Sequence, residues 1–332
     1  MDVLREAALD SPDAEGLEDG GRTWTFAELD AAASRMARRL APLGAEPRAT
    51  LALVADPGPL AVQALFAASR LGATVAPLNV GLRPPEFEAA FDTLRPDMIL
   101  ATRQARDAAG LDPVWVTSLD DLPKPMDERG GDDTPLPEPL AVLWTSGTDG
   151  RPRGVCLSSQ AFDRVSEASR DLLRSGPGAR WYASLSLGHV GGLATVLRSV
   201  SHRATLVTRG RFDAKEFAGL VDAGSVTHAS LVPTMLDRLL GAREGRPAPP
   251  SLKCLLVGGA HAPSSLVARA LELGYPLALT YGMTETTSQV ATASPALVRE
   301  KPGTVGRPLS GLEVRLTTEG EIQVRGPTVA VG

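Results

Sequence analysis

The stretch LWTSGTDGRPRG (Leu143–Gly154) contains three glycines, three serine or threonine hydroxyls and two arginines, directly after an apolar run. Small residues let backbone N–H groups converge on an anion, and hydroxyls and arginines add donors and charge. The same residue types also build ordinary turns. The stretch has no Gly-Lys-Ser/Thr at the spacing of a Walker A loop. Composition alone therefore leaves a phosphate-binding loop and a plain turn both open.

Apolar strand-like runs alternate with helical segments on both sides of this stretch. Residues 25–44 predict a helix, because Thr25 and Glu28 have capping-box spacing, apolar residues recur on one helical face and Gly44 ends the segment. Nearly all-apolar strands between helices indicate a parallel sheet covered on both faces. The expected strands are residues 49–55, 73–79, 97–102, 140–144, 154–158, 181–187, 204–208, 226–232, 252–259 and 277–282.

The predicted fold class is α/β, with two packed α/β subdomains and largely parallel sheets. Residues 122–140 hold five prolines and two glycines among charged residues, which is typical of a linker. We therefore expect a first α/β unit over 1–121 and a second over 141–302. From residue 303 short β-like pieces predict a small β element over 303–332.

Composition limits the classes of partner. The 332 residues are 43% hydrophobic with a net charge of -5, which offers no basic field for nucleic acid or anionic lipid. No stretch approaches the length of a membrane span, and the first residues do not resemble a signal peptide. The two cysteines, Cys156 and Cys254, lie in apolar runs rather than in a metal-type pair. We expect a cytoplasmic protein with a small-molecule ligand, and we leave a homodimer open.

Five stretches in order resemble the adenylate-forming enzymes, the superfamily of acyl-CoA synthetases, luciferases and peptide-synthetase adenylation domains. RTWTFAELD and GATVAPLN resemble its N-terminal blocks, TSGTDGRPRGV its phosphate loop and YGMTETTSQV its second core motif. GTVGRPLSGLEVRL followed by GEIQVRGP resembles its third and fourth core motifs. The resemblance spans nearly the whole chain and implies the large AMP-binding (adenylation) domain of this superfamily over 1–332.

The resemblance implies that a carboxylate attacks the α-phosphate of ATP and that pyrophosphate leaves. Glu285 would supply the oxygen ligand for Mg²⁺, Thr284 a hydroxyl for the α-phosphate and Tyr281 an aromatic face for adenine. Without the resemblance, these residues could simply pack a strand end and cap a helix. The implied nucleotide-binding residues are Thr145, Ser146, Gly147, Thr148, Gly150, Arg153, Gly258, Gly259, Ala260, Thr280, Tyr281, Gly282, Met283 and Thr284, with Thr145, His189, Thr284 and Glu285 as the catalytic set.

His189 stands in LSLGHVGGL, where the family often has an aromatic or histidine phrase that positions the acyl carboxylate. Gly188 departs from the aromatic residue that is common there, and His189 could instead cap a helix. THASLVPTMLDRLL and YGMTETTSQVAT resemble o-succinylbenzoate-CoA ligases, which implies an aromatic acid with a second carboxylate and coenzyme A as co-substrate. The candidate acyl-site residues are His189, Arg198, Ser230, Ser288 and Gln289.

Two further departures bear on activity. Asp149 puts a negative charge in the phosphate loop, where it either caps the turn or opposes the phosphates, and Arg153 stands where lysine is common. After the Arg-Gly-Pro phrase, the superfamily continues to a ribose-binding aspartate and a mobile domain with the adenylation lysine. If 332 residues are the whole molecule, we expect nucleotide and acyl-adenylate binding with severely reduced adenylation. Two alternatives stay open: another acyl- or aryl-CoA or carrier-protein ligase, and a non-catalytic nucleotide-binding module.

Overall fold

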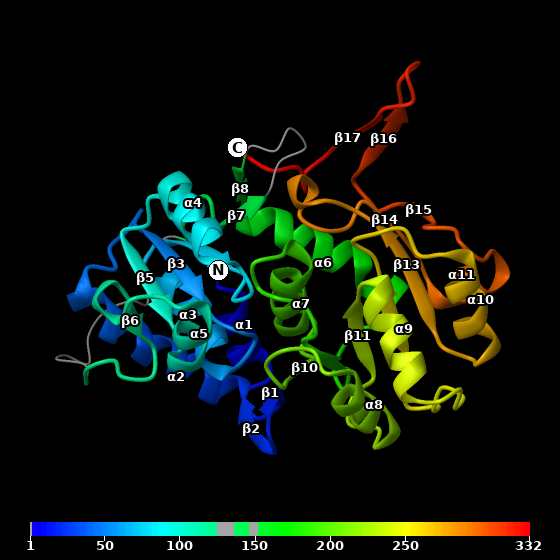
Figure 1. Cartoon of the computed structure of the whole chain (residues 1–332), viewed down its shortest axis with the longest axis horizontal. Helices are drawn as coiled ribbons and strands as arrows, with labels where there is room; N and C mark the ends of the chain where they lie inside the picture. Colours follow the sequence, from blue (N-terminus) through cyan, green and yellow to red (C-terminus); the bar gives the residue numbers. More distant parts are fainter. Residues whose placement is uncertain (1, 125–135, 146–151) are drawn as a thin grey trace.

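The computed structural model describes residues 2–124, 136–145 and 152–332. Within these ranges the chain forms two large sheets with helices between and around them (Figure 1). The first sheet has the order β6-β5-β3-β4-β7-β8. Its strands are β3 (Thr50–Val54), β4 (Thr74–Leu78), β5 (Met98–Ala101), β6 (Thr117–Ser118), β7 (Ala141–Thr145) and β8 (Arg153–Leu157).

The second sheet has the order β15-β14-β13-β12-β11-β9-β10-β1-β2. The central strands are parallel, whereas β2, β14 and β15 pair antiparallel at the two edges. The expected parallel α/β architecture is therefore confirmed. The strands are β1 (Glu15–Asp19), β2 (Arg22–Thr25), β9 (Arg180–Tyr182), β10 (Thr205–Thr208), β11 (His228–Leu231), β12 (Cys254–Val257), β13 (Leu277–Tyr281), β14 (Ala291–Ala293) and β15 (Arg307–Pro308).

The described helices follow the predicted alternation and add several that the sequence pattern did not predict. The capping box of α2 is present, since Thr25 and Glu28 exchange both bonds. The α-helices are α1 (Val3–Asp10), α2 (Phe26–Leu40), α3 (Pro59–Arg70), α4 (Pro84–Leu94), α5 (Arg103–Ala109), α6 (Ser159–Leu173), α7 (Val190–Ser201), α8 (Ala214–Asp222), α9 (Pro233–Ala242), α10 (Ser264–Glu272) and α11 (Pro295–Glu300). Short 3-10 turns are η1 (Ala41–Leu43), η2 (Pro113–Trp115) and η3 (Thr284–Thr286).

The sheets do not divide the chain at the expected boundaries. Strands β7 and β8, at 141–157, pair into the first sheet because β7 lies parallel to β4. Strands β1 and β2 pair into the second sheet because β1 lies parallel to β10. Strand pairing between distant segments therefore places parts of the chain from both sides of 122–140 in each sheet, and the subdomain boundaries stay a prediction.

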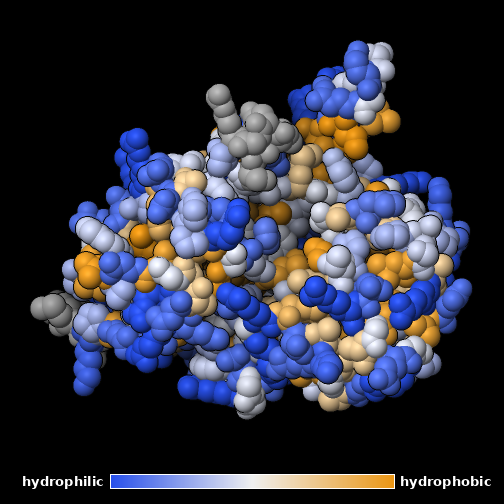
Figure 2. Space-filling model, viewed as in Figure 1, coloured by the Kyte–Doolittle hydropathy of each residue, from blue (hydrophilic) through white to orange (hydrophobic). Residues whose placement is uncertain are grey.

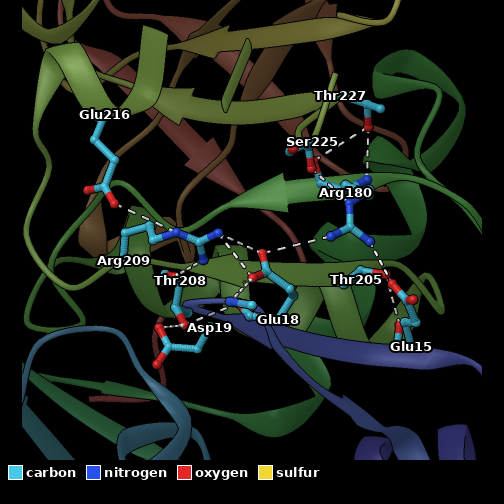
Figure 3. Close-up of polar contacts among 11 residues, drawn as sticks. Glu15, Glu18, Asp19, Arg180, Thr205, Thr208, Arg209, Glu216, Ser225 and Thr227 are labelled. Carbon is cyan, nitrogen blue, oxygen red and sulfur yellow. Dashed lines mark hydrogen bonds and ion pairs between the residues drawn. The ribbon is translucent and has the colours of Figure 1, made fainter. Parts of the chain in front are cut away.

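An ionic network fixes the N-terminal strand to the second sheet (Figure 3). Glu18 is 8% exposed and accepts hydrogen bonds from Arg209 Nη2 at both carboxylate oxygens, at 3.0 Å each. Arg180 lies 3.8 Å from Glu18 and also pairs with Glu15 at 2.6 Å. Because the strands β1, β10 and β9 are neighbours, these contacts join three strands across one edge of the molecule.

Helices α6 and α7 lie between the two sheets (Figure 1). One continuous apolar core joins residues of α2 and α3, such as Met36 and Phe66, with Phe162 of α6 and Leu193 and Val200 of α7. The second sheet has a further core on the side of α8, α9 and α10. Helix α7 is therefore buried on most sides, and its first residue lies between the two sheets.

The final β element is a hairpin of β16 (Glu313–Leu316) and β17 (Ile322–Arg325), as the sequence predicted. It stands away from the body, and apolar side chains gather on it (Figure 2). Leu316 is 69% exposed and Ile322 42% exposed. Within the described ranges, no helix combines the length and apolar character needed to cross a membrane.

Candidate functional site

Several of the predicted site residues lie where neighbouring strands of the second sheet end. β13, β12, β11 and β9 are adjacent and parallel, so their carboxyl ends share one edge. Tyr281 ends β13, Gly258 follows β12 and Ser230 lies one residue before the end of β11. This edge is where ligands bind in open parallel sheets.

The loop after β12 packs closely against β13. A Cβ at Gly258 would lie 2.5 Å from Thr280 Cγ2, so only glycine lets this loop approach β13. Gly259 has a φ of 78°, in the left-handed region. Gly259 and Ala260 are exposed beside Tyr281, which is half-buried. The structure thus brings Gly258, Gly259, Ala260, Thr280 and Tyr281 together, with open backbone that a flat base can approach.

The turn after β13 folds back tightly on itself. A Cβ at Gly282 would lie 1.5 Å from the Ser288 carbonyl oxygen, and Val290 N donates to Tyr281 O at 2.8 Å. Thr287 and Ser288 both have positive φ, at 53° and 89°. Left-handed backbone in a β-branched threonine is costly and persists only where its surroundings enforce it. The turn that carries Met283, Thr284 and Glu285 is therefore held by its packing.

Glu285 carries an exposed carboxylate in η3. Among the described residues its carboxylate makes no hydrogen bond or ion pair, and no cluster of three metal-ligating side chains occurs. Mg²⁺ is typically held by one or two carboxylates together with phosphate oxygens and water. The single unpaired carboxylate of Glu285, close to the carboxyl ends of the strands of the second sheet, fits that set of ligands. Thr284, in the same turn, is half-buried.

The quoted stretch connects β7 and β8 at the edge of the first sheet. Thr145 ends β7 and lies opposite Arg153, its Oγ1 3.5 Å from the Arg153 carbonyl oxygen. Strand β8 contacts η3, so the strand that follows the loop lies against the Glu285 turn. The remaining loop predictions, at Ser146, Gly147, Thr148, Asp149 and Gly150, lie outside the described residues.

His189 precedes α7 and faces the end of β4 in the first sheet. Its Nε2 lies 3.4 Å from Asn79 Nδ2, just beyond the end of β4. The ring is exposed at one side, and desolvation by the surrounding atoms lowers the pKa of His189. A Cβ at Gly188 would lie 2.5 Å from Asn79 N, so the aromatic residue common in the family does not fit here. Asn79 is a contact residue that we did not predict, although a polar residue directly after an apolar strand is its signal.

Arg198 is 1% exposed on α7, so it does not face solvent as most helix arginines do. Its Nη2 donates to Gln289 Oε1 at 2.8 Å, and the guanidinium lies 5.3 Å from the Trp181 ring centroid. Within the described ranges, Nε and Nη1 have no hydrogen-bond partner and no carboxylate pairs with the group. Burial lowers the pKa of Arg198 from its usual value to about 10. A buried cation with unused donors is poised for an anion.

The other acyl-site candidates lie around α7. Ser230 Oγ accepts from Thr195 Oγ1 at 3.0 Å, and the Ser184 hydroxyl donates to the Ser230 carbonyl. Gln289 bridges Arg198 to Thr292, donating to Thr292 Oγ1 at 2.7 Å. Ser288 lies in the left-handed turn. The structure thus brings Ser230, Arg198 and Gln289 to one helix, which extends inward from His189.

Two buried histidines near Arg198 make structural bonds. His202 Nε2 lies 2.9 Å from the Ser166 carbonyl, and His228 Nε2 lies 3.0 Å from the Leu173 carbonyl, so each carries its proton on Nε2. Burial lowers the pKa of His202 to about 3 and that of His228 to about 4, and nearby Arg198 acts in the same direction. Both rings are therefore neutral at neutral pH.

Comparisons with known proteins agree with this geometry. The family model described as AMP-binding enzyme matches residues 4–332. The 2-succinylbenzoate–CoA ligases of Bacillus pumilus and Bacillus licheniformis are 32% and 33% identical, over 99% of this chain and 70% and 71% of theirs. The structure of o-succinylbenzoate CoA synthetase from Bacillus subtilis in complex with the acyl-adenylate intermediate OSB-AMP has a TM-score of 0.86 and 29% identity, over 99% of this chain and 70% of that one.

A second structure of the Bacillus subtilis synthetase, in complex with ATP and magnesium ion, has a TM-score of 0.87 and 29% identity. That match covers 100% of this chain and 72% of the solved one. The long family match, the relatives above 30% identity and the shared fold agree with one another. The chain therefore belongs to the family of AMP-binding enzymes.

Proposed function

We propose that the chain belongs to an acid:CoA ligase, which activates 2-succinylbenzoate with ATP to an acyl adenylate before transfer to coenzyme A. The relatives at 32% and 33% identity are 2-succinylbenzoate–CoA ligases, and a similar solved structure binds OSB-AMP. The observation that carries the substrate is Arg198, a buried guanidinium with two unused donors. A second carboxylate on the acid supplies the missing anion.

The proposed nucleotide site lies along the edge formed by β12 and β13. The base lies against Gly258, Gly259 and Ala260 and stacks on Tyr281, since the glycines keep this backbone open. Residues Thr280, Gly282 and Met283 shape the adjacent wall. Thr284 donates its hydroxyl to the α-phosphate, and Glu285 holds Mg²⁺, which neutralises charge on the phosphate oxygens. Thr145 and Arg153, together with Ser146, Gly147, Thr148 and Gly150, complete the proposed phosphate side.

His189 positions the acid for attack. The reacting carboxylate bonds to phosphorus, and the bond to pyrophosphate breaks. A neutral imidazole can donate one N–H to that carboxylate while its other nitrogen accepts from Asn79 Nδ2. The lowered pKa of His189 keeps the ring neutral at physiological pH, so it orients the carboxylate without forming a strong ion pair. Arg198, Ser230, Ser288 and Gln289 form the proposed far end of the acyl site.

The setting of the protein is proposed on the same basis. A cytoplasmic location agrees with soluble, nucleotide-dependent chemistry, and fractionation of cells tests it. A homodimer is proposed as the assembly state, and sedimentation velocity at two concentrations distinguishes it from a monomer. Neither affects the chemistry of the site.

Calorimetric titration of the chain tests the function. The titrants are AMP, Mg·ATP, a non-hydrolysable 2-succinylbenzoyl-adenylate mimic and a long-chain acyl-adenylate mimic. We expect the 2-succinylbenzoyl mimic to bind tightest, because it fills both halves of the site. A preference for the long-chain mimic supports a different acyl-CoA or carrier-protein ligase, and binding of nucleotides alone supports a non-catalytic module. Absence of all binding contradicts the site itself.

A further inference from the structure

The segment Thr328–Gly332, here called the terminal segment, bonds both to β8 of the first sheet and to the Glu285 turn after β13 of the second sheet. Ala330 N donates to the Glu285 carbonyl oxygen at 2.8 Å. Val331 N donates to Cys156 O at 3.0 Å, and Cys156 N donates to Gly332 O at 2.7 Å. Figure 1 shows the chain running back from β17 to lie beside β8. The segment therefore binds the outer edge of β8 and the turn that carries Glu285 at the same time.

Backbone bonds rather than apolar burial hold the terminal segment. Val329 is 37% and Val331 60% exposed, so neither side chain contributes much to a core. The Thr328 side chain is buried at 2% exposed, yet its hydroxyl has no partner among the described residues. The main-chain N–H and carbonyl groups of the terminal segment instead form hydrogen bonds with Glu285, Thr287 and Cys156.

Thr287 connects this segment to the strained turn. Its side chain is fully buried, its φ is 53°, and its hydroxyl donates to the Thr328 carbonyl at 2.8 Å. A β-branched residue pays a steric penalty in the left-handed region, and a buried hydrogen bond can offset it. The bond to Thr328 and the bond from Ala330 to Glu285 thus enclose η3 from both sides.

We propose that the terminal segment positions the Glu285 turn against β8, through Thr287 and the Ala330 amide, so that the Glu285 carboxylate is held where it can bind the metal of a triphosphate. The role of Glu285 here rests on the proposed function. Thr287 and Ala330 are positioning residues, because neither carries a group that reaches the nucleotide in this account. The contribution is larger for the metal-bound triphosphate than for AMP, because the turn reaches AMP only through Thr284 and Tyr281, whereas the triphosphate also depends on the metal held by Glu285.

Thr287→Val tests the proposal and Thr287→Ser is its matched control. Valine keeps the shape but removes the donor, whereas serine keeps the donor. We expect Thr287→Val to weaken Mg·ATP binding about fivefold, the effect of one hydrogen bond, while AMP affinity changes less than twofold. Thr287→Ser is expected to restore the wild-type value. Calorimetric titrations with AMP, with ATP and with Mg·ATP measure the three affinities.

Cys156 supplies a readout that does not depend on nucleotide. A Cβ at Gly332 would lie 3.8 Å from the Cys156 Sγ, so the terminal segment lies against this half-buried thiol, and the other cysteine, Cys254, is fully buried. Thiol labelling is therefore expected to accelerate severalfold in Thr287→Val and to stay slow in Thr287→Ser. If the unaltered chain binds neither AMP nor Mg·ATP, the proposed function fails, while the labelling rates still decide whether these bonds hold the segment.

Ala330→Pro provides a second variant in case Thr287→Val does not fold. Proline removes the N–H that bonds to Glu285, and Ala330→Gly keeps it. The proline variant is expected to repeat the selective loss of Mg·ATP affinity and the faster labelling, and the glycine variant is not. Equal losses for AMP and Mg·ATP, unchanged labelling, or faster labelling with unchanged Mg·ATP affinity would each overturn the proposal.

Discussion

Replacing Arg198 with methionine is expected to leave the fold nearly as stable as before while removing recognition of a second carboxylate. Burial lowers the pKa of Arg198 to about 10, which corresponds to a charge-burial cost on the order of 3 kcal/mol. Methionine removes that cost. It also leaves Gln289 Oε1 without a donor, at about 2 kcal/mol, and removes the contact with Trp181, at about 1 kcal/mol.

These opposing terms nearly cancel, so we expect the free energy of unfolding of Arg198→Met to stay within about 1 kcal/mol of wild type. Removing one partner of a buried ion pair would instead cost about 3–5 kcal/mol. Urea unfolding followed by circular dichroism measures the difference. Arg203→Met is the matched control, because Arg203 follows α7 and pairs with Asp10 at the surface. That control should change stability by less than about 1 kcal/mol.

The affinity for adenylate mimics distinguishes an Arg198 that binds the second carboxylate from one that only stabilises the fold. The 2-succinylbenzoyl-adenylate mimic should lose about 2 kcal/mol, or roughly thirtyfold in affinity, in Arg198→Met, because a charge-assisted bond is removed. A mimic without the second carboxylate should bind both proteins alike. A loss of more than about 3 kcal/mol in stability, or an equal loss for both mimics, would show that Arg198 does not bind the second carboxylate.

Three further outcomes follow from the described contacts. The pKa values of His202 and His228, about 3 and about 4, lie below that of an unfolded histidine, so the unfolded chain binds more protons than the folded chain between pH 6.5 and 4. The free energy of unfolding should therefore decrease as the pH is lowered through that range, by up to about 1.4 kcal/mol per pH unit for each ring. Urea unfolding of a variant with glutamine at both positions should show a weaker dependence on pH. Gly188→Ala should weaken acyl-adenylate binding more than tenfold while AMP binding is kept, because the added Cβ meets the rigid Asn79 backbone. Gly191→Ala is the control, because its Cβ would meet a movable leucine side chain, and it should have a small effect in the same titrations. Glu18→Gln should cost about 2 kcal/mol in urea unfolding, because Arg209 and Arg180 each lose one charged hydrogen-bond or ion-pair partner while keeping Glu216 and Glu15, and a cost below about 0.5 kcal/mol would mean that the network is solvent-screened.

The helices and strands were largely predictable because their patterns are local. The alternation around residues 140–282 and the capping box at Thr25 and Glu28 depend on neighbouring residues, and both are confirmed. The division between the sheets was not predictable. It depends on β4 pairing with β7 across more than sixty residues, and no local pattern encodes that partner.

The site was predictable in its residue types and less so in their environment. The stretch YGMTET indicated which side chains matter, but the left-handed Thr287 and its bond to Thr328 arise from a contact across 41 positions. The glycine at 188 is a departure in the motif, and its reason is the backbone of Asn79 in the other unit. Arg198 was a candidate by charge alone, while its burial follows from how α7 packs between the sheets.

One site is expected to bind the adenylate at the strand ends of the second sheet and the second carboxylate at Arg198. A crystal structure of the chain with the 2-succinylbenzoyl-adenylate mimic tests it most directly. We expect the base against Gly258–Ala260 and Tyr281, and the second carboxylate within 3.5 Å of the Arg198 guanidinium, directly or through one water, as a charge-assisted bond requires. A mimic bound with that carboxylate in solvent, or with its base away from the β12–β13 edge, would contradict the account.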